Sequence, residues 1–176
     1  EHHVETPWVS MARLIHDAFG TSFRQPWAAL ELIFWNAAVT TEPAPGVREA
    51  LDACRAAGIT IAVLSNSSFG APVITHELAK HGLDRFFAFV MVTADYAVRK
   101  PNPLVVDVAV ARIGTPVADT WFIGDRLDTD VAGARAAGIT TAWYSRGRTD
   151  DHPDADVVIP DWSAFTAAVT GRRSER

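Results

Sequence analysis

The stretch "WFIGDRLDTDVAGARAAGITTAWY", residues 121–144, decides the fold. It joins a short apolar run to a helical pattern and then to a second apolar run, which is the order of a parallel α/β sheet. Three aspartates, Asp125, Asp128 and Asp130, fall within six residues where the first apolar run ends. One aspartate would be enough to cap the helix that follows. The cluster therefore indicates a chemical role as well as a structural one.

The alternation of strands and helices continues on both sides of this stretch. Short apolar runs rich in β-branched residues predict buried strands of a parallel sheet, and the amphipathic segments between them predict covering helices. We therefore expect an α/β fold, a Rossmann-like parallel sheet flanked by helices, with a small helical cap. The predicted strands are 59–66, 87–92, 120–125, 140–145 and 157–160, and the predicted helices are 45–58, 71–82, 102–114, 129–138 and 161–169.

The first part of the chain has a different pattern of apolar residues. Residues 7–20 and 26–39 carry apolar side chains at helical spacing with no strand between them. The segment "TTEPAPG", residues 40–46, breaks this pattern with two prolines and a glycine. We predict a helical cap module over residues 1–42 and an α/β core domain over residues 43–176.

Composition narrows the classes of function. The formal net charge of −5 over 176 residues gives no basic face for a nucleic acid or an anionic membrane surface. The single cysteine, Cys54, cannot form an internal disulfide and offers no cysteine-based zinc site. No apolar run reaches membrane-spanning length. We expect a cytoplasmic protein that binds a small molecule, and a homodimer is compatible with the sequence.

Polar side chains collect where the predicted strands end. Ser65 and Asn66 follow the first strand, Lys100 follows the second, and Asp125 and Asp130 follow the third. Ligands of an open parallel sheet bind outside the carboxyl ends of its strands. The order of the segments therefore predicts that a hydroxyl, an ammonium and two carboxylates meet at one edge.

This set suits phosphoryl chemistry. Ser65, with the backbone amides near it, and Lys100 offer a phosphate hydrogen-bond donors and a positive charge. Carboxylates would repel a phosphate unless a divalent cation lay between them, and hard oxygen ligands select Mg²⁺. Taken singly, each residue has a structural alternative: Ser65 as a turn former, Lys100 as a surface lysine, Asp128 as a helix cap.

Three segments together resemble the second, third and fourth motifs of the haloacid dehalogenase superfamily, which is dominated by magnesium-dependent phosphatases. They are "VLSNSS" at 63–68, "YAVRKPNP" at 96–103 and "FIGDRLDTDVAGARAAG" at 122–138. The resemblance covers residues 45 to about 165, and residues 5–42 look like the helical cap of capped members.

The resemblance implies a role for each residue at the strand ends. Ser65 and Asn66 would bind the phosphoryl group, and Lys100 would stabilise both that group and the nucleophile. Asp125 would hold Mg²⁺, and Asp130 would support the metal directly or through water.

The first motif of this family, D-x-D-x-[TV], is missing from the sequence. It lies on the first, central strand and supplies the nucleophilic aspartate and the acid/base. About five apolar residues buried in such a strand would contribute roughly 1.5–3 kcal/mol each, which rivals the whole stability of a domain, about 5–15 kcal/mol. We therefore expect a further strand, encoded upstream or supplied by another chain.

The predicted function is magnesium-dependent hydrolysis of a small phosphate ester through an aspartyl-phosphate. A 2-haloacid dehalogenase is the first alternative, but dehalogenation needs no magnesium, and Asp125 with Asp130 keeps the acidic motif of the phosphatases. A catalytically inactive interaction protein is the second alternative. Retention of Lys100 and both aspartates argues against it, because an unused carboxylate cluster is electrostatically costly.

Overall fold

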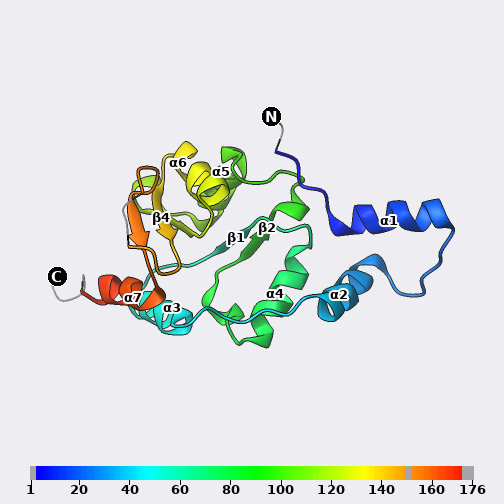
Figure 1. Ribbon diagram of the computed structural model, residues 1–176, viewed down its shortest axis with the longest axis horizontal. Helices are drawn as coiled ribbons and strands as arrows, with labels where there is room; N and C mark the ends of the chain where they lie inside the picture. Colours follow the sequence, from blue (N-terminus) through cyan, green and yellow to red (C-terminus); the bar gives the residue numbers. More distant parts are fainter. Residues whose placement is uncertain (1–2, 150–151, 172–176) are drawn as a thin grey trace.

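The computed structural model describes residues 3–149 and 152–171 (Figure 1). It has the predicted α/β architecture: helices and parallel strands alternate from residue 47 to residue 144, and the strand at 157–159 then follows with no helix before it in the described residues. The α-helices are α1 (Trp8–Phe19), α2 (Trp27–Ala38), α3 (Val47–Ala56), α4 (Ala71–Lys80), α5 (Pro103–Ile113), α6 (Ala132–Ala136) and α7 (Trp162–Gly171). The strands are β1 (Val63–Ser65), β2 (Val90–Val92), β3 (Trp121–Gly124), β4 (Thr140–Tyr144) and β5 (Val157–Ile159). Short helical turns add η1 (Asp84–Phe86), η2 (Thr93–Asp95), η3 (Val117–Asp119) and η4 (Leu127–Val131).

Local sequence signals explain several helix ends. Gly20 ends α1 with a φ of 62°, a left-handed conformation that glycine adopts without steric cost. The side chain of Asn102 accepts a hydrogen bond from the backbone N–H of Leu104 at the start of α5. Asp161 caps α7, as predicted, by accepting from Ala164 N at 2.8 Å.

The strands of the described residues form two parallel sheets. One pairs β1 with β2, and the other has the order β3-β4-β5. The prediction of a strand over residues 59–66 is too long, because β1 covers only Val63–Ser65. Its partner β2 is itself three residues long, and a ladder ends where its partner ends.

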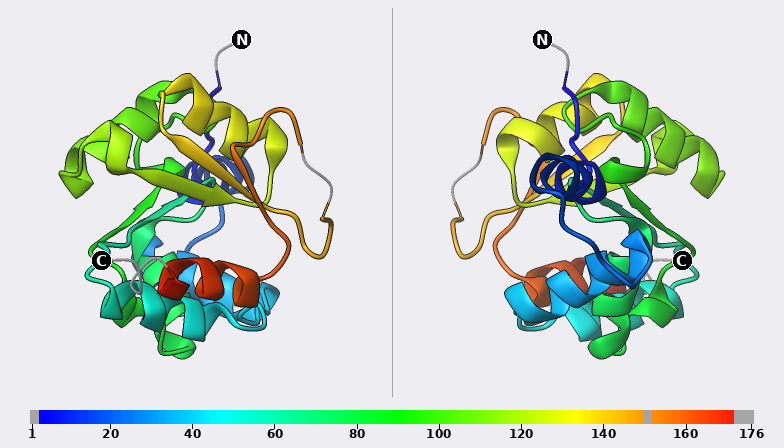
Figure 2. Two further views of the ribbon diagram at one scale, coloured as in Figure 1. Left: turned by 90° about the vertical axis from the view of Figure 1, so that its left-hand side faces the viewer. Right: turned by 90° about the vertical axis from the view of Figure 1, so that its right-hand side faces the viewer.

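The core lies where the two sheets meet their covering helices. Figure 2 shows α5 and α6 on one side of the strands and α3, α4 and α7 on the other. A buried cluster on the side of α5 and α6 packs against Leu64 of β1 and Phe122 of β3, so it contacts both sheets. A smaller cluster lies beneath α3 and η1. The members of the first cluster are Met91, Val105, Val106, Ala134 and Ile139, and those of the second are Leu51, Leu83 and Phe86.

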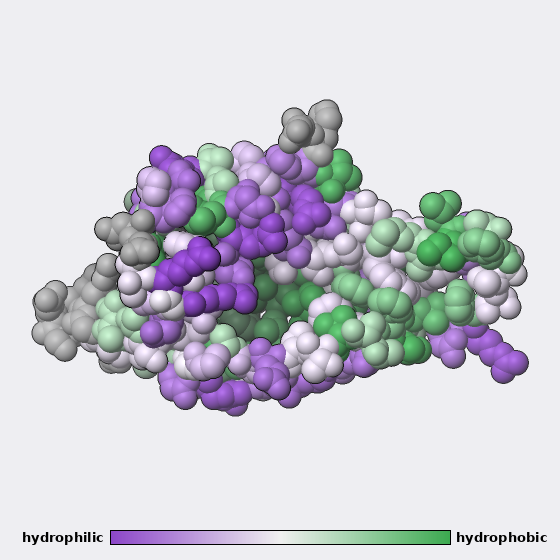
Figure 3. Space-filling view, viewed as in Figure 1, coloured by the Kyte–Doolittle hydropathy of each residue, from purple (hydrophilic) through white to green (hydrophobic). Residues whose placement is uncertain are grey.

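Helices α1 and α2 lie side by side at one end of the molecule, away from β3-β4-β5 (Figure 1). Hydrophobic side chains gather over them in Figure 3, and Leu14 and Phe19 are among the most exposed, at 71% and 77%. Both helices precede residue 42, and the division of the chain into a cap and a core stays a prediction. Among the described residues, no helix is both long and apolar enough to cross a bilayer.

An aromatic side chain and two carboxylates fasten α2 to the rest of the molecule. Phe69, in the loop after β1, packs edge-on against Trp35 with ring centroids 4.9 Å apart. Glu31 of α2 accepts a hydrogen bond from the backbone N–H of Gly70 at 2.9 Å, and it is buried. Glu77 of α4 accepts from the indole N–H of Trp35 at 2.7 Å. Polar contacts of this kind fix orientation because each buried oxygen needs its donor.

Candidate active site

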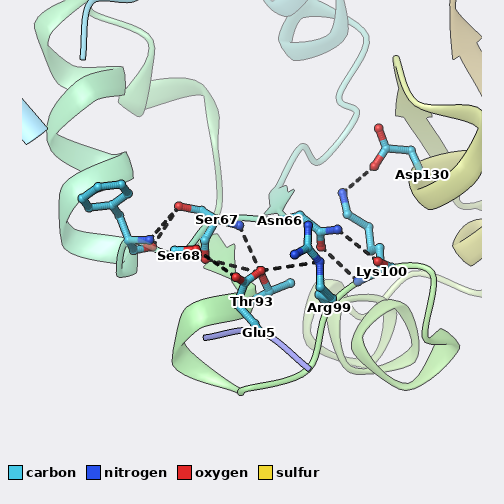
Figure 4. Close-up of polar contacts among 9 residues, drawn as sticks. Glu5, Asn66, Ser67, Ser68, Thr93, Arg99, Lys100 and Asp130 are labelled. Carbon is cyan, nitrogen blue, oxygen red and sulfur yellow. Dashed lines mark hydrogen bonds and ion pairs between the residues drawn. The ribbon is translucent and has the colours of Figure 1, made fainter. Parts of the chain in front are cut away.

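Lys100 links the two sheets at the carboxyl ends of their strands (Figure 4). Its ammonium Nζ donates to the backbone oxygen of Leu64 in β1 at 2.9 Å. The same Nζ lies 2.7 Å from Oδ1 of Asp130, which follows β3. The side chains of Lys100 and Asp130 are only 5% and 11% exposed, so this ion pair is shielded from water. Lys100 is therefore a buried lysine and not the surface lysine of the structural alternative.

Asn66 holds the main chain of Lys100 through both ends of its amide group. Its Nδ2 donates to Lys100 O at 3.0 Å, and its Oδ1 accepts from Lys100 N at 2.9 Å. Figure 4 shows the two side by side. The loop after β1 thus sets the position of the lysine backbone, and the predicted contact of Asn66 with a phosphate stays a prediction.

Ser65 is the last residue of β1 and directly follows Leu64, whose carbonyl receives the Lys100 ammonium. Within the described residues, the Ser65 hydroxyl makes no hydrogen bond to the protein. A hydroxyl at a strand end with this freedom can donate to a ligand. Its assignment to the phosphoryl group also stays a prediction.

Asp125 and Asp130 are the two carboxylates that are predicted to hold a metal. Each of them lies against a different cationic side chain. Asp130 packs over Gly124, where any side chain would collide with its carboxylate, and it accepts from the backbone N–H of Arg126 at 3.2 Å. Asp125 instead directs Oδ2 to Nη2 of Arg146, at 2.5 Å. Asp130 is thus rigidly held, whereas Asp125 is partly exposed and paired with an exposed arginine.

Asp128, the third aspartate, is peripheral. Its carboxylate pairs with Arg126 at 2.8 Å, and both side chains are more than 60% exposed. The hydrogen bond from Arg126 is the main reason that the pKa of Asp128 lies below its ordinary value. The residue lies inside the π-helical turn η4, not at the N-cap of a helix, so the capping alternative for Asp128 is wrong.

Sequence reasoning missed a buried carboxylate beside this site. Glu5, 4% exposed, accepts from Ser68 Oγ at 2.9 Å and from Thr93 Oγ1 at 2.8 Å (Figure 4). Arg99 Nε lies 3.8 Å from the same carboxylate. Nothing in the local sequence around Glu5 signals these contacts, since they join residues 63 to 94 positions apart.

Sequence reasoning also missed Arg146, for which a signal existed. Arg146 stands just past the end of β4, and the rule that strand ends carry ligand-binding residues applies to β4 as it does to β1 and β3. Its neighbour Trp143 donates its indole N–H to the backbone oxygen of Asp125 at 3.2 Å. Residues at the end of β4 therefore contact both the backbone oxygen of Asp125, through Trp143, and its carboxylate, through Arg146.

The donor set suits a hard divalent cation. Asp125 and Asp130 supply two carboxylates from one strand end, and Mg²⁺ is usually held by one or two carboxylates plus water molecules. In the part of the chain that the structure describes, no group of three histidine, cysteine or acidic side chains surrounds a common point. Asp125 and Asp130 are the residues that could hold such a cation together with water molecules.

The match to a family model decides the identity. A model of the haloacid dehalogenase-like hydrolases matches residues 23–144, which include β1, β3 and the predicted site residues Ser65, Asn66, Lys100, Asp125 and Asp130. The chain belongs to this family. The match begins within the α1–α2 connection and ends with β4.

Two phosphatases resemble the chain over part of their length. A glyceraldehyde 3-phosphate phosphatase of Methanopyrus kandleri is 36% identical over 87 residues, 49% of this chain and 37% of that protein. A phosphoglycolate phosphatase of Agrobacterium fabrum is 34% identical over 134 residues, 73% of this chain and 55% of that protein. The chain thus spans about half the length or less of these relatives.

A solved haloacid dehalogenase-like structure supports the fold. The crystal structure of a HAD phosphatase from Thermococcus onnurineus superimposes with a TM-score of 0.66, at 21% sequence identity. The superposition covers 90% of this chain and 70% of that chain. At this identity the likeness establishes the architecture alone.

Proposed function

We propose that the chain is part of a magnesium-dependent phosphomonoester hydrolase that acts on a small phosphorylated metabolite in the cytoplasm. The observation that carries the proposal is the position of the Lys100 ammonium, 2.9 Å from the carbonyl next to Ser65 and 2.7 Å from Asp130. A buried cation that pairs with one strand-end carboxylate and contacts the strand that ends in Ser65 suits the binding of a phosphoryl group. Phosphatases among the relatives support the same class of reaction.

The nucleophile of this proposal is an aspartate on a further strand between β1 and β3. Within the described residues, β1 pairs only with β2, and β3 pairs only with β4. Both strands point their carboxyl ends toward Lys100, which spans the interval between them. This split sheet supports the proposal of a central strand, because such a strand would pair with both edges.

The chemistry assigned to the site is an in-line displacement at phosphorus. A carboxylate oxygen of the nucleophile forms a bond to phosphorus, the ester P–O bond breaks, and the alcohol leaves with a proton from an acid. Water then hydrolyses the aspartyl-phosphate to give inorganic phosphate. Ser65 donates to a phosphoryl oxygen, and Lys100 stabilises the charge on the phosphoryl group and on the nucleophile.

Asp125 and Asp130 would hold the metal in this proposal. When bound, Mg²⁺ neutralises charge between phosphate and carboxylates. Helices α1 and α2, within residues 1–42, form the cap that shields the site from water and selects the substrate in this proposal.

Hydrolysis of p-nitrophenyl phosphate by the protein that carries this chain and the central strand tests the proposal. We expect release of the phenol with Mg²⁺ and none after chelation. Asp125→Asn should lower kcat/KM by at least about a hundredfold, as loss of a principal electrostatic group does. Asp128→Asn is the matched control, because Asp128 is exposed and paired with Arg126, and it should retain activity. Release that chelator leaves unchanged would contradict the metal assignment.

A further inference from the structure

Arg146 has an uncommon backbone conformation beside Asp125. Its φ angle is 54°, in the left-handed region that side chains other than glycine rarely adopt. The turn is tied to the end of β5, where the backbone N–H of Gly147 donates to Pro160 O at 2.8 Å. Backbone strain of this kind clusters at functional sites. The contact made by the Arg146 side chain is therefore a candidate for function.

That contact is with a predicted metal ligand. Nη2 of Arg146 donates to Oδ2 of Asp125 at 2.5 Å, and Trp143 fixes the backbone oxygen of the same aspartate. The arginine side chain is 71% exposed and the aspartate side chain 39% exposed. An arginine this exposed can swing into water with little loss of packing, while the aspartate main chain stays in place.

A carboxylate oxygen paired with a guanidinium is a poorer ligand for a cation. An ion pair between exposed side chains is weak, so a divalent cation can displace it. The competition would thus set the affinity for the metal without preventing its binding.

We propose that Arg146 is a built-in competitor for the metal, which occupies Asp125 in the free protein and leaves when a divalent cation binds. The inference rests on the proposed metal role of Asp125 and adds a residue that tunes it. Arg146 lies outside the three motif segments quoted from the sequence, in the turn that leads from β4 toward β5. It would make the free site less attractive to cations and more nearly neutral.

Arg126 provides a matched comparison on the same edge. It is also an exposed arginine beside the acidic cluster, at 64% exposure, but its guanidinium pairs with Asp128. Removing Arg126 deletes one positive charge near the site without freeing Asp125. The difference between the two arginines therefore separates direct competition from general electrostatics.

Isothermal titration of the chain with MgCl₂ at low ionic strength tests this inference. We expect Arg146→Ala and Arg146→Gln to lower the Kd for Mg²⁺ by about three- to tenfold, which corresponds to the loss of an exposed ion pair and of one repelling charge. Arg126→Ala should change the Kd by less than about twofold. Alanine or glutamine at position 146 must adopt the same left-handed backbone conformation as arginine. Thermal unfolding should therefore confirm that each variant is folded.

Several outcomes would overturn the inference. They are an unchanged or higher Kd in both Arg146 variants, an equal effect of Arg126→Ala, or no Mg²⁺ binding by any variant. Persistence of the Arg146 effect in an Asp125→Asn background would also overturn it, because the metal would then lie elsewhere. Failure of the proposed function gives a different result. If the chain shows the Arg146 effect on Mg²⁺ affinity but never hydrolyses a phosphate ester, the competition stands and only the proposed reaction is wrong.

Discussion

Lys100 and Asp130 form a buried ion pair between the two sheets, with Nζ and Oδ1 2.7 Å apart. Removing one partner of such a pair leaves the other charge buried and unpaired, at a cost of about 3–5 kcal/mol. We expect Lys100→Ala to lower the free energy of unfolding by about 3 kcal/mol in urea titrations. Arg126→Ala breaks only the exposed pair with Asp128, which water screens, and should lower the free energy of unfolding far less.

Equal losses in these two variants would show that the Lys100 pair is no more shielded than a surface pair. The expected loss of stability in Lys100→Ala also affects the interpretation of an activity assay. Absence of turnover in Lys100→Ala is informative only at a temperature where the variant is shown to be folded. A circular dichroism spectrum recorded under the assay conditions provides that check.

Asn66 predicts a local effect on the Lys100 main chain. Its amide makes two hydrogen bonds to Lys100 N and O, and each contributes about 0.5–1.5 kcal/mol. We expect Asn66→Ala to lower the free energy of unfolding by about 2 kcal/mol and to speed hydrogen exchange at the Lys100 amide. Asn102→Ala, which removes the cap of α5, should destabilise the protein without a selective effect on that amide. Unchanged exchange at Lys100 in Asn66→Ala would contradict the positioning role.

Glu77 predicts a specific loss of stability in acid. Hydrogen bonds from Thr41 and Trp35 lower the pKa of its carboxyl from 4.5 to about 2. A carboxyl whose pKa is lower in the folded state stabilises the protein above the unfolded pKa, and that contribution disappears as the pH falls from about 4.5 to about 2. We expect the stability difference between the wild type and Glu77→Gln to be on the order of 3 kcal/mol at pH 7 and to shrink across this range.

Urea titrations of both proteins at pH 7, 4 and 3 measure this difference. The comparison cancels the titration of all other carboxyl groups. Trp35→Phe removes one of the two main donors and should give part of the effect. A difference that does not depend on pH would mean that the Glu77 carboxyl is not held in its ionised form.

Thr129 predicts a neutral or stabilising substitution within the acidic motif. Its Oγ1 is buried and, within the described residues, has no hydrogen-bond partner. A buried hydroxyl without a partner costs about 1–3 kcal/mol, so Thr129→Val should leave stability unchanged or raise it by up to about 1 kcal/mol. Thr129→Ser keeps the hydroxyl and loses a methyl group, and it should be less stable than the valine variant. A clear loss of stability in Thr129→Val, measured in urea, would show that the hydroxyl has a partner such as bound water.

Much of the site follows from one rule about parallel strands. Because their carboxyl ends share an edge, the order of apolar runs was sufficient to predict that Lys100 approaches the acidic cluster, and Lys100 does contact Asp130. The same rule, applied to β4, leads to Arg146. Its contact with Asp125 depends in addition on a left-handed turn, which no glycine or asparagine at that position announces.

Other features could not be predicted because they depend on long-range packing. Glu5 reaches Thr93 across 88 positions, and no periodicity in the sequence encodes such a pair. The strand-end position of Asn66 predicts a phosphate contact, which stays a prediction, whereas its two hydrogen bonds to Lys100 depend on where the loops meet. Strand lengths were overestimated for the same reason, since ladder formation needs a partner of equal length.

The split sheet has a practical consequence for handling the protein. One side of β1 and one side of β3 lack a strand neighbour within the described residues, and unpaired strand edges are templates for intermolecular association. Purification of this chain alone should therefore favour dilute, cold conditions, and loss of material would rise with concentration. A short synthetic peptide of continuous β-branched apolar residues would be expected to reduce that loss by covering both edges.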